Sequence, residues 1–291
     1  MTKILRGAPV ADQLKEEMAV KVNTYINQGI NPKIAILRVG NRPDDLAYEA
    51  RVFKNCQKIG MDFESVYMDD NTIMVDLIDR LNKLNKNPDI HGILIFRPLP
   101  AQLDERIVAK AINPEKDIDC MSPENWGKVF AGETTGLGPC TPLAVIALLN
   151  FYGYELSGLN VVVINRSMVL GKPLSMMLLA SHSTVTICHS KTKDLAILTR
   201  QAEVVVTGVG RPKYFGRKFF TDQSSIIDVG INFDGDQMCG DVDYEAVSDC
   251  CAAITPVPGG IGAVTSMVLL QNVIKALDIQ QIYENKQYRE E

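Results

Sequence analysis

Polar and glycine residues follow several short apolar runs, where the ends of parallel strands could present them to a ligand. After the run Leu159–Ile164 come Asn165, Arg166, Ser167 and then Gly171. A strand, a polar turn and a helix N-terminus can hold a pyrophosphate on free N–H groups and the helix dipole. Gly208 and Gly210 follow a later run and would allow a nucleotide close to the backbone. The G-x-G-x-x-G fingerprint is missing, so a loop without a ligand remains the alternative.

The end of the second strand of this half bears on the choice of nucleotide. NAD-binding folds usually place a carboxylate there, on the ribose 2′-hydroxyl. Here the run ends in Cys188, His189, Ser190 and Lys191, without a carboxylate. Arg166, Ser190 and Lys191 could instead meet a 2′-phosphate, which favours NADP and leaves NAD open.

The first half offers an aromatic residue and two carboxylates. Tyr48 lies on a predicted helix and either faces a ligand or packs in the core. Asp117 and Asp119 stand among apolar neighbours, and either can bind a polar ligand group or make an ordinary turn. Near the other end of the chain, the segment 255–262 has two prolines and three glycines directly before a helix, which is typical of a shaped loop where something docks.

Alternating strands and helices must position these residues. Apolar runs without internal polar alternation predict buried parallel strands, and the intervening periodic segments predict helices. The expected strands are 34–39, 61–68, 90–96, 161–164, 185–188, 204–207, 226–229 and 253–255. A last helix is expected at about 263–277, followed by a polar, frayed end at 278–291. The pattern predicts an α/β protein with a parallel sheet, and 291 residues suggest two domains.

Composition excludes several classes of protein. The net charge of −5 argues against nucleic acid as a partner, since phosphates need a basic face. The longest apolar runs fall short of the roughly 20 residues that span a bilayer, and the N-terminus lacks a signal-peptide pattern. Seven cysteines without a C-x-x-C pair and three histidines predict a reduced, cytoplasmic protein without a metal site.

Taken together, the segments resemble the methylenetetrahydrofolate dehydrogenase/cyclohydrolase family over nearly the whole chain. The segments that carry the resemblance are Tyr48 to Gly60, Gly92–Pro100, Lys116–Asp119, Pro139–Pro142, Asn165–Ser167 with Gly171, Cys188–Ser190, Asp228–Asn232 and Thr255–Gly260. The resemblance implies two domains around a cleft. Residues 1–140 would form the folate-binding domain, onto which the helix 263–277 packs back, and residues 141–291 a Rossmann-like NAD(P)-binding domain. It also implies a homodimer that oxidises 5,10-methylenetetrahydrofolate with NADP or NAD.

The same resemblance implies roles for individual residues. Tyr48 would stack on the folate and Asp119 would bind its pterin ring. The loops with Pro98 and Pro100, and with Pro258, Gly259 and Gly260, would wall the substrate site. The residues expected at the cofactor are Asn165, Arg166, Ser167, Ser190, Gly208, Gly210 and Ile231.

Two departures from the family pattern concern the second reaction. Members that also hydrolyse the methenyl product have a lysine four residues after the tyrosine and a glutamine that holds it; here these positions are Val52 and Phe96. Neither side chain can transfer a proton, so we expect a monofunctional dehydrogenase that depends on a separate cyclohydrolase. Arg51, Lys54 or a water could take over instead. Arg97 is expected on the opposite face from Phe96, because side chains alternate along a strand.

Another departure is Asn165, which replaces a glycine and could alter the choice of nucleotide. Three other functions remain open at this point. The chain could be a full bifunctional dehydrogenase/cyclohydrolase, a non-catalytic folate- or nucleotide-binding paralogue, or a dehydrogenase for another pterin.

Overall fold

The computed structural model describes the backbone of residues 2–290 and the side chains of residues 2–282. The chain forms two compact units. The six-stranded unit comprises the residues up to Asp12, Phe130–Gly132 and Thr141–Thr265, and the three-stranded unit comprises Gln13–Val129, Glu133–Cys140 and the residues from Ser266 onward. A domain boundary at residue 140 stays a prediction, since the first and last helices each contribute residues to both units.

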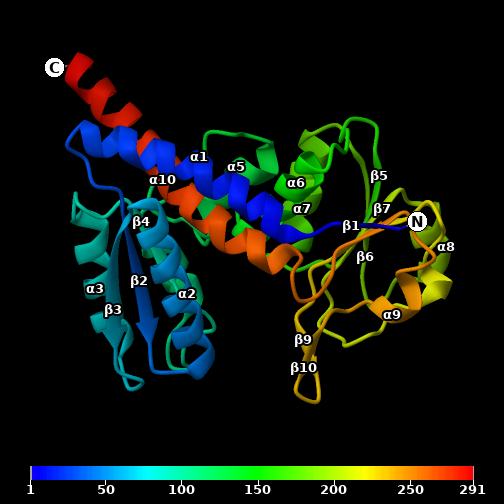
Figure 1. Ribbon diagram of the computed structural model, residues 1–291. Helices are drawn as coiled ribbons and strands as arrows, with labels where there is room; N and C mark the ends of the chain where they lie inside the picture. The colour runs from blue at the N-terminus through cyan, green and yellow to red at the C-terminus, as the bar shows by residue number, and fades with distance from the viewer. Residues whose placement is uncertain (1, 291) are drawn as a thin grey trace. The chain divides into compact units, whose positions relative to one another are not determined.

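The three-stranded unit is built on a small parallel sheet (Figure 1). Its strands β2 (Lys33–Val39), β3 (Asp62–Met68) and β4 (Gly92–Ile95) lie in the order β3-β2-β4. The four residues of β2 from Ile34 to Leu37 have no exposed surface. Because successive side chains point to opposite faces, both faces of this strand are covered, as the apolar run predicted.

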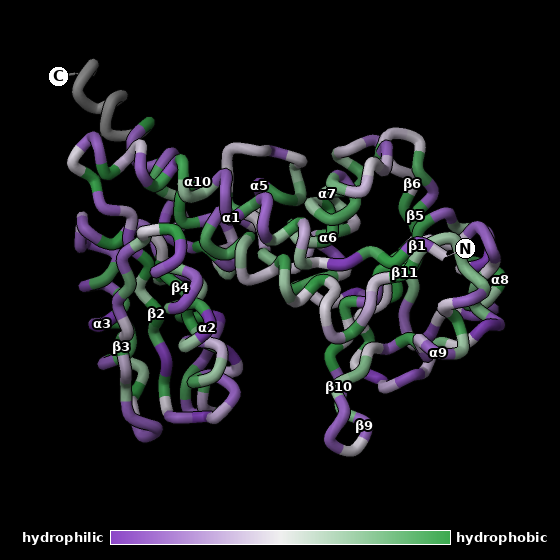
Figure 2. The backbone as a smooth tube through the Cα atoms, viewed as in Figure 1, coloured by the Kyte–Doolittle hydropathy of each residue, from purple (hydrophilic) through white to green (hydrophobic). Residues whose placement is uncertain are grey.

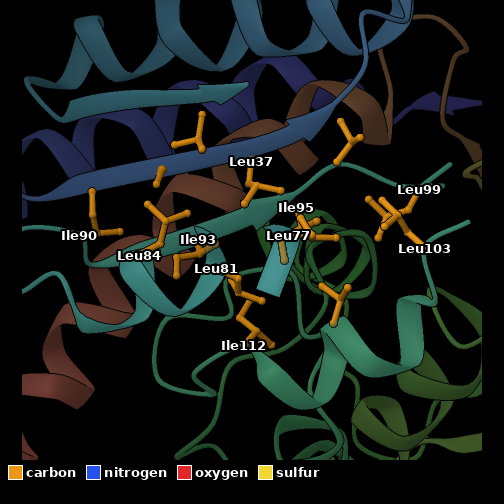
Figure 3. Packing of buried hydrophobic residues seen from close by; sticks show 14 residues of the cluster. Leu37, Leu77, Leu81, Leu84, Ile90, Ile93, Ile95, Leu99, Leu103 and Ile112 are labelled. Carbon is orange, nitrogen blue, oxygen red and sulfur yellow. The ribbon is translucent and has the colours of Figure 1, made fainter. Parts of the chain in front are cut away.

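One core of this unit lies between the sheet and two of its helices. Strand residues such as Leu37 and Ile95 pack against Leu77 and Leu81 of α3 (Met74–Lys86) and Val108 of α4 (Glu105–Ala111) (Figure 3). Leu77, Leu81 and Leu84 are spaced by three and four residues, so they share one helical face. The remaining helices of the unit are α1 (Gly7–Asn27), α2 (Pro43–Ile59), α5 (Pro123–Ala131) and α10 (Ile261–Glu290).

Helix α10 is longer than the sequence predicted. Its backbone continues through residues 278–290, where a frayed end was expected; the side chains from residue 283 and all of residue 291 lie outside the described part. Asn272 of α10 donates to the carbonyls of Ile118 and Gly138, both at 2.8 Å. The helix therefore holds the chain segment that contains Asp119.

The six-stranded unit contains an all-parallel sheet in the order β1-β11-β8-β7-β5-β6. Its strands are β1 (Lys3–Ile4), β5 (Asn160–Ile164), β6 (Thr184–Cys188), β7 (Val204–Thr207), β8 (Ser225–Asp228) and β11 (Ala253–Ile254). The valines of β5 and β7 are buried as predicted, and Figure 2 labels β5 in its place in this unit.

Helices and a hairpin complete the six-stranded unit. They are α6 (Cys140–Phe151), α7 (Gly171–Ala180), α8 (Leu195–Gln201), the 3₁₀ turn Arg217–Phe219, α9 (Tyr244–Val247) and the antiparallel pair β9 (Asn232–Asp234) and β10 (Gln237–Cys239). The hairpin was not predicted, because its residues are mostly polar and exposed.

The segment Ile261–Ile282 of α10 is long and apolar enough to cross a membrane, which the run lengths of the sequence did not indicate. However, 67% of its most apolar window is buried inside the protein. Burial of this extent is typical of a core helix.

The buried His91, directly before β4, makes the stability of the three-stranded unit depend on pH. Its Nδ1 accepts a hydrogen bond from the backbone N–H of Lys33 at 3.1 Å. Burial and the charge of Lys116 lower its pKa from 6.5 to about 4. The folded state thus binds fewer protons than the unfolded state between these values, so stability is lost as the pH falls through this window.

Between pH 7 and 4.5, His91 should cost the wild type about 2 to 3 kcal/mol of unfolding free energy, by linkage. The variant His91→Asn should not show this part of the loss. Urea denaturation at both pH values measures this. The matched variant His182→Asn, at an exposed histidine, should keep the wild-type dependence. An equal dependence in all three proteins would contradict the prediction.

Candidate functional site

Tyr48 and Phe96 form an aromatic pair in the three-stranded unit. Tyr48 lies on α2, and Phe96 directly follows β4; their ring centroids are 5.7 Å apart at an interplanar angle of 51°. Val52, one helical turn after Tyr48, is completely buried, and Phe96 is 7% exposed. The two positions where the resemblance led us to expect lysine and glutamine are therefore apolar and buried near the tyrosine.

Arg97 and Asp119 form an ion pair in the same unit. Nη2 of Arg97 donates to Oδ2 of Asp119 at 2.9 Å, and the two side chains are 27% and 26% exposed. The sequence predicted Arg97 on the opposite face from Phe96, and the structure places its guanidinium against Asp119. Strand alternation applies only within the strand, and β4 ends at Ile95, so the backbone beyond it places Arg97 against the carboxylate.

The two aspartates of the segment 116–119 have different roles. Asp117 is completely buried, and its carboxylate accepts hydrogen bonds from the N–H groups of Met121 and Ser122 and from Nδ2 of Asn125. Its acceptors are thus used within its own loop. Asp119 is partly exposed. Of the two aspartates, it is therefore the one whose carboxylate can meet a ligand.

The phenol of Tyr48 lies in the electrostatic field of this carboxylate. Burial raises its pKa above the usual value, and the nearby Cys140 and Asp119 raise it further, against the opposing charge of Arg51. Tyr48 therefore keeps its proton at neutral pH and can donate a hydrogen bond. Burial and Asp119 also raise the pKa of the Cys140 thiol, so this thiol is not a nucleophile at neutral pH.

The two proline loops belong to different units. In the three-stranded unit, the loop with Pro98 and Pro100 is anchored where the N–H of Leu99 donates to Glu105 at 2.9 Å. In the six-stranded unit, Pro258 and Gly259 are exposed and Gly260 is buried. A Cβ on Gly260 would lie 2.5 Å from the carbonyl oxygen of Pro256, so only glycine fits this turn.

Asn165 organises the turn between β5 and α7. Its Oδ1 accepts from the N–H groups of Ser167 and Gly171, and its Nδ2 donates to the carbonyl of Gly208. The N–H groups of Leu170 and Lys172 also bond to Ser167. The prediction of a pyrophosphate on free N–H groups at the start of α7 is thus wrong for these groups, because the turn itself uses them.

The first residue of α7 must be glycine. A Cβ on Gly171 would lie 2.0 Å from the carbonyl oxygen of Asn165, closer than any real contact allows. The helix therefore begins in direct contact with the turn that carries Arg166 and Ser167, whose side chains are exposed.

A cavity of about 480 Å³ lies beyond the carboxyl ends of β5 and β6. Its apolar lining residues include Ile164, Leu195, Tyr214 and Phe219, and its polar ones include Ser190, Asp194, Arg211 and Lys218. Of the residues predicted to meet a 2′-phosphate, Ser190 lines this cavity, whereas Arg166 and Lys191 are exposed outside its described lining.

The cations that line the cavity rest on aromatic rings. The guanidinium of Arg211 lies 5.1 Å from the ring centroid of Tyr214, and the ammonium of Lys218 lies 5.0 Å from that of Phe219. Positive charge beside an apolar wall suits an adenosine that carries an extra phosphate. The cavity therefore combines an apolar wall with two cations at the ends of β5 and β6.

Two buried carboxylates hold the neighbouring loops. Asp241 accepts from the N–H groups of Val209 and Arg211 and from Nδ2 of Asn232. Asp228 accepts from three further N–H groups, and burial raises its pKa to about 6. These bonds position the loop that contains Gly208 and Gly210. Ile231, on the next loop, is 61% exposed and so is accessible to a ligand.

Residues 139–281 match the model of the tetrahydrofolate dehydrogenase/cyclohydrolase NAD(P)-binding domain, and residues 5–119 match that of the catalytic domain. Over 281 residues the chain is 47% identical to the bifunctional protein FolD 1 of Desulfitobacterium hafniense, covering 96% of this chain and 100% of that protein. The chain belongs to the tetrahydrofolate dehydrogenase/cyclohydrolase family.

Solved structures of this family have the same fold. The bifunctional FolD of Campylobacter jejuni superposes with a TM-score of 0.92 at 34% identity, covering 95% of this chain and 98% of that one. The FolD of Trypanosoma brucei, solved with NADP and an inhibitor, has a TM-score of 0.90 at 30% identity and covers 95% and 97% of the two chains.

Sequence reasoning missed three charged residues of this tetrahydrofolate dehydrogenase/cyclohydrolase family member. Arg97 meets Asp119 only because the chain leaves the strand after Ile95. Arg211 and Lys218 follow different elements and converge only in three dimensions. For Arg211 and Lys218, the sequence indicated only that basic residues occur in the segments after β7. Among the described residues, no group of three or more His, Cys, Asp and Glu could hold a metal ion.

Proposed function

We propose that this protein is a methylenetetrahydrofolate dehydrogenase with weak or absent cyclohydrolase activity. The observation that carries the proposal is the apolar, buried pair Val52 and Phe96 beside Tyr48. The dehydrogenase reaction moves a hydride from the methylene carbon to a nicotinamide and needs no proton transfer, so positioning is its main requirement. Hydrolysis of the methenyl product needs proton transfers, and no titratable side chain stands at either position.

The residues of the three-stranded unit bind and orient the substrate in this proposal. The ring of Tyr48 stacks on the folate, and its protonated phenol donates a hydrogen bond. Asp119 accepts from the pterin N–H groups, which are donors of the kind a carboxylate binds well. Val52 and Phe96 exclude water from the side of the site where hydrolysis would begin.

The residues of the six-stranded unit bind the cofactor in this proposal. The nicotinamide, when bound, accepts the hydride. The 2′-phosphate of NADP is held by Ser190, Arg211 and Lys218. Arg166 and Ser167, on the turn before α7, bind the cofactor as well. The side chain of Asn165 is hydrogen-bonded to the turn and to Gly208, so it stabilises the turn. It takes no direct part in the choice of nucleotide. Asp194 also lines the cavity and could bind a ribose hydroxyl, which is why NAD remains the alternative cofactor.

The cofactor assignment predicts a change of preference. In Arg211→Gln/Lys218→Gln, the KM for NADP should rise about 10²-fold or more, because each of the two charge-assisted hydrogen bonds contributes about 1.5 to 3 kcal/mol. The KM for NAD should change less than threefold. Steady-state kinetics with both cofactors measure the ratio.

Arg217→Gln serves as the matched control for the cofactor prediction. Arg217 is a neighbouring exposed cation that pairs with Asp249 and lies outside the described lining of the cavity. It should leave both KM values unchanged. An equal rise for NADP and NAD in the double variant would show that these cations do not contact the 2′-phosphate.

The bifunctional enzyme is the second candidate, which the relatives favour, since two of those named above are called bifunctional. A paired assay on the purified protein separates the two. One reaction follows oxidation of methylenetetrahydrofolate with NADP and then NAD, and the other follows loss of methenyltetrahydrofolate above its spontaneous rate. Oxidation without accelerated hydrolysis supports the proposal, and accelerated hydrolysis overturns it in favour of the bifunctional enzyme.

The same assay distinguishes the dehydrogenase from a non-catalytic paralogue and from a dehydrogenase for another pterin. A non-catalytic paralogue would bind folate or nucleotide without turnover, and a dehydrogenase for another pterin would not oxidise methylenetetrahydrofolate. We further propose a cytoplasmic homodimer that relies on a separate cyclohydrolase, as the family membership and the absent lysine suggest.

A further inference from the structure

Arg97 brings a second polar side chain to the candidate substrate site. Its guanidinium lies 2.9 Å from Asp119, and Asp119 lies close enough to Tyr48 to raise the pKa of the phenol. Phe96, the residue before Arg97, contacts the ring of Tyr48. The ion pair and the aromatic pair therefore belong to one site.

The contact between Arg97 and Asp119 leaves hydrogen-bonding capacity on both partners. A guanidinium has five N–H donors, and the described residues engage one of them, through Nη2. The carboxylate uses Oδ2 for this bond. With about a quarter of each side chain exposed, the pair presents N–H donors directly beside a carboxylate acceptor.

This donor and acceptor pattern is complementary to one edge of the pterin ring. A 2-amino-4-oxo pyrimidine presents the O4 acceptor next to the N3–H and 2-amino donors. The guanidinium can donate to O4 while the carboxylate accepts from N3–H and the amino group. A 2,4-diamino ring would instead place an amino donor against the guanidinium and leave both groups unpaired.

We propose that Arg97 is a specificity-determining residue that, together with Asp119, selects the 4-oxo form of the pterin ring over its 4-amino form. The inference rests on the proposed function, because it takes the folate to bind at Tyr48 and Asp119. Asp119 distinguishes the two rings at N3, which carries a hydrogen only in the 4-oxo form, and Arg97 adds discrimination at position 4. A site built to bond a polar group rejects an analogue that leaves its partners unpaired.

The test compares binding of tetrahydrofolate with that of its 4-amino analogue, each titrated against the full-length protein by calorimetry. The wild type should bind tetrahydrofolate about 10- to 100-fold more tightly, a modest ratio for such a site because water reaches the pair. Arg97→Leu should lower the ratio of the two Kd values about 10-fold, mainly by weakening tetrahydrofolate. Arg97→Lys keeps a cation and should retain part of the preference.

Arg106→Leu provides the matched control for Arg97→Leu. It breaks another Arg–Asp pair of the same unit, between Arg106 and Asp104 at 2.7 Å, whose arginine is 88% exposed. Its ratio should equal that of the wild type. If Arg97→Leu weakens both ligands equally, or changes neither, the proposal is overturned and the pair only supports the loop.

Methylenetetrahydrofolate oxidation by the same samples separates this result from the proposed function. An unchanged Kd ratio in an active wild type overturns the role of Arg97 alone. A wild type that neither binds tetrahydrofolate nor oxidises its methylene form overturns both.

Discussion

Replacing Val52 by lysine and Phe96 by glutamine together should raise methenyltetrahydrofolate hydrolysis about 10²- to 10⁴-fold, the usual contribution of a positioned acid–base group. Val52 lies one helical turn after Tyr48 on α2, so a lysine there shares the face of the tyrosine. Burial at this position would lower the pKa of the new lysine toward neutrality. The glutamine, in place of a ring 5.7 Å from that of Tyr48, would give the ammonium an acceptor.

The two substitutions should be strongly non-additive. Val52→Lys alone buries a charge without a partner at a site with no exposed surface, which should lower both stability and hydrolysis relative to the pair. Phe96→Gln alone supplies no titratable group and should leave hydrolysis at the wild-type rate. Hydrolysis rates and melting temperatures of the wild type, both single variants and the double variant form the complete cycle.

Val52→Met/Phe96→Leu is the matched control, because it changes the same two positions and keeps them apolar. It should remain at the wild-type hydrolysis rate. If this control gains activity as the lysine–glutamine variant does, altered packing and not proton transfer is responsible. If the wild type already hydrolyses the substrate, another group acts. Arg51 is a poor candidate, because a guanidinium stays protonated, and Lys54 is exposed while Val52 is buried.

The strands of both units could be predicted because their apolar runs indicate burial on both faces. The run from Ile34 to Leu37 is apolar at each position, and only a strand covered on both faces buries every residue of such a run. The hairpin of β9 and β10 lacks this signal, because each of its strands has only three residues and a single large apolar one. Helix α10 continues beyond its predicted end, because polar residues can continue a helix as well as apolar ones do.

The candidate site could be predicted from the sequence only in part. For Tyr48 and Asp119 the residue type alone left core packing and an ordinary turn open, and the family resemblance supplied their predicted roles; both lie in the unit that contains Phe96. Arg97 could not be assigned, since its direction depends on where β4 ends. Asn165 was expected to face the cofactor, but its side chain bonds the turn and Gly208. Both cases depend on backbone geometry that periodicity does not encode.

Asp119→Ala should lower kcat/KM for methylenetetrahydrofolate about 10²-fold or more and leave the Kd of NADP within twofold. The loss combines two effects: the pterin donors lose a charged acceptor, at about 1.5 to 3 kcal/mol for a hydrogen bond to a charged group, and the guanidinium of Arg97 loses its partner. Steady-state kinetics and a separate NADP titration measure the two quantities. Asp79→Ala, which breaks the exposed pair with Lys83 on α3, should change neither.

Asp117, two residues earlier, distinguishes recognition from support of the loop. Its carboxylate accepts from Met121, Ser122 and Asn125 and is completely buried. Asp117→Asn should therefore lower the melting temperature, because an amide cannot accept from all these donors, and the surviving folded protein should keep its KM for the folate. Asp119→Ala should show the reverse, a raised KM at nearly unchanged stability, because its carboxylate lies at the surface of the site. If the two variants behaved alike, both aspartates would support the loop, and the pterin would have to be bound elsewhere.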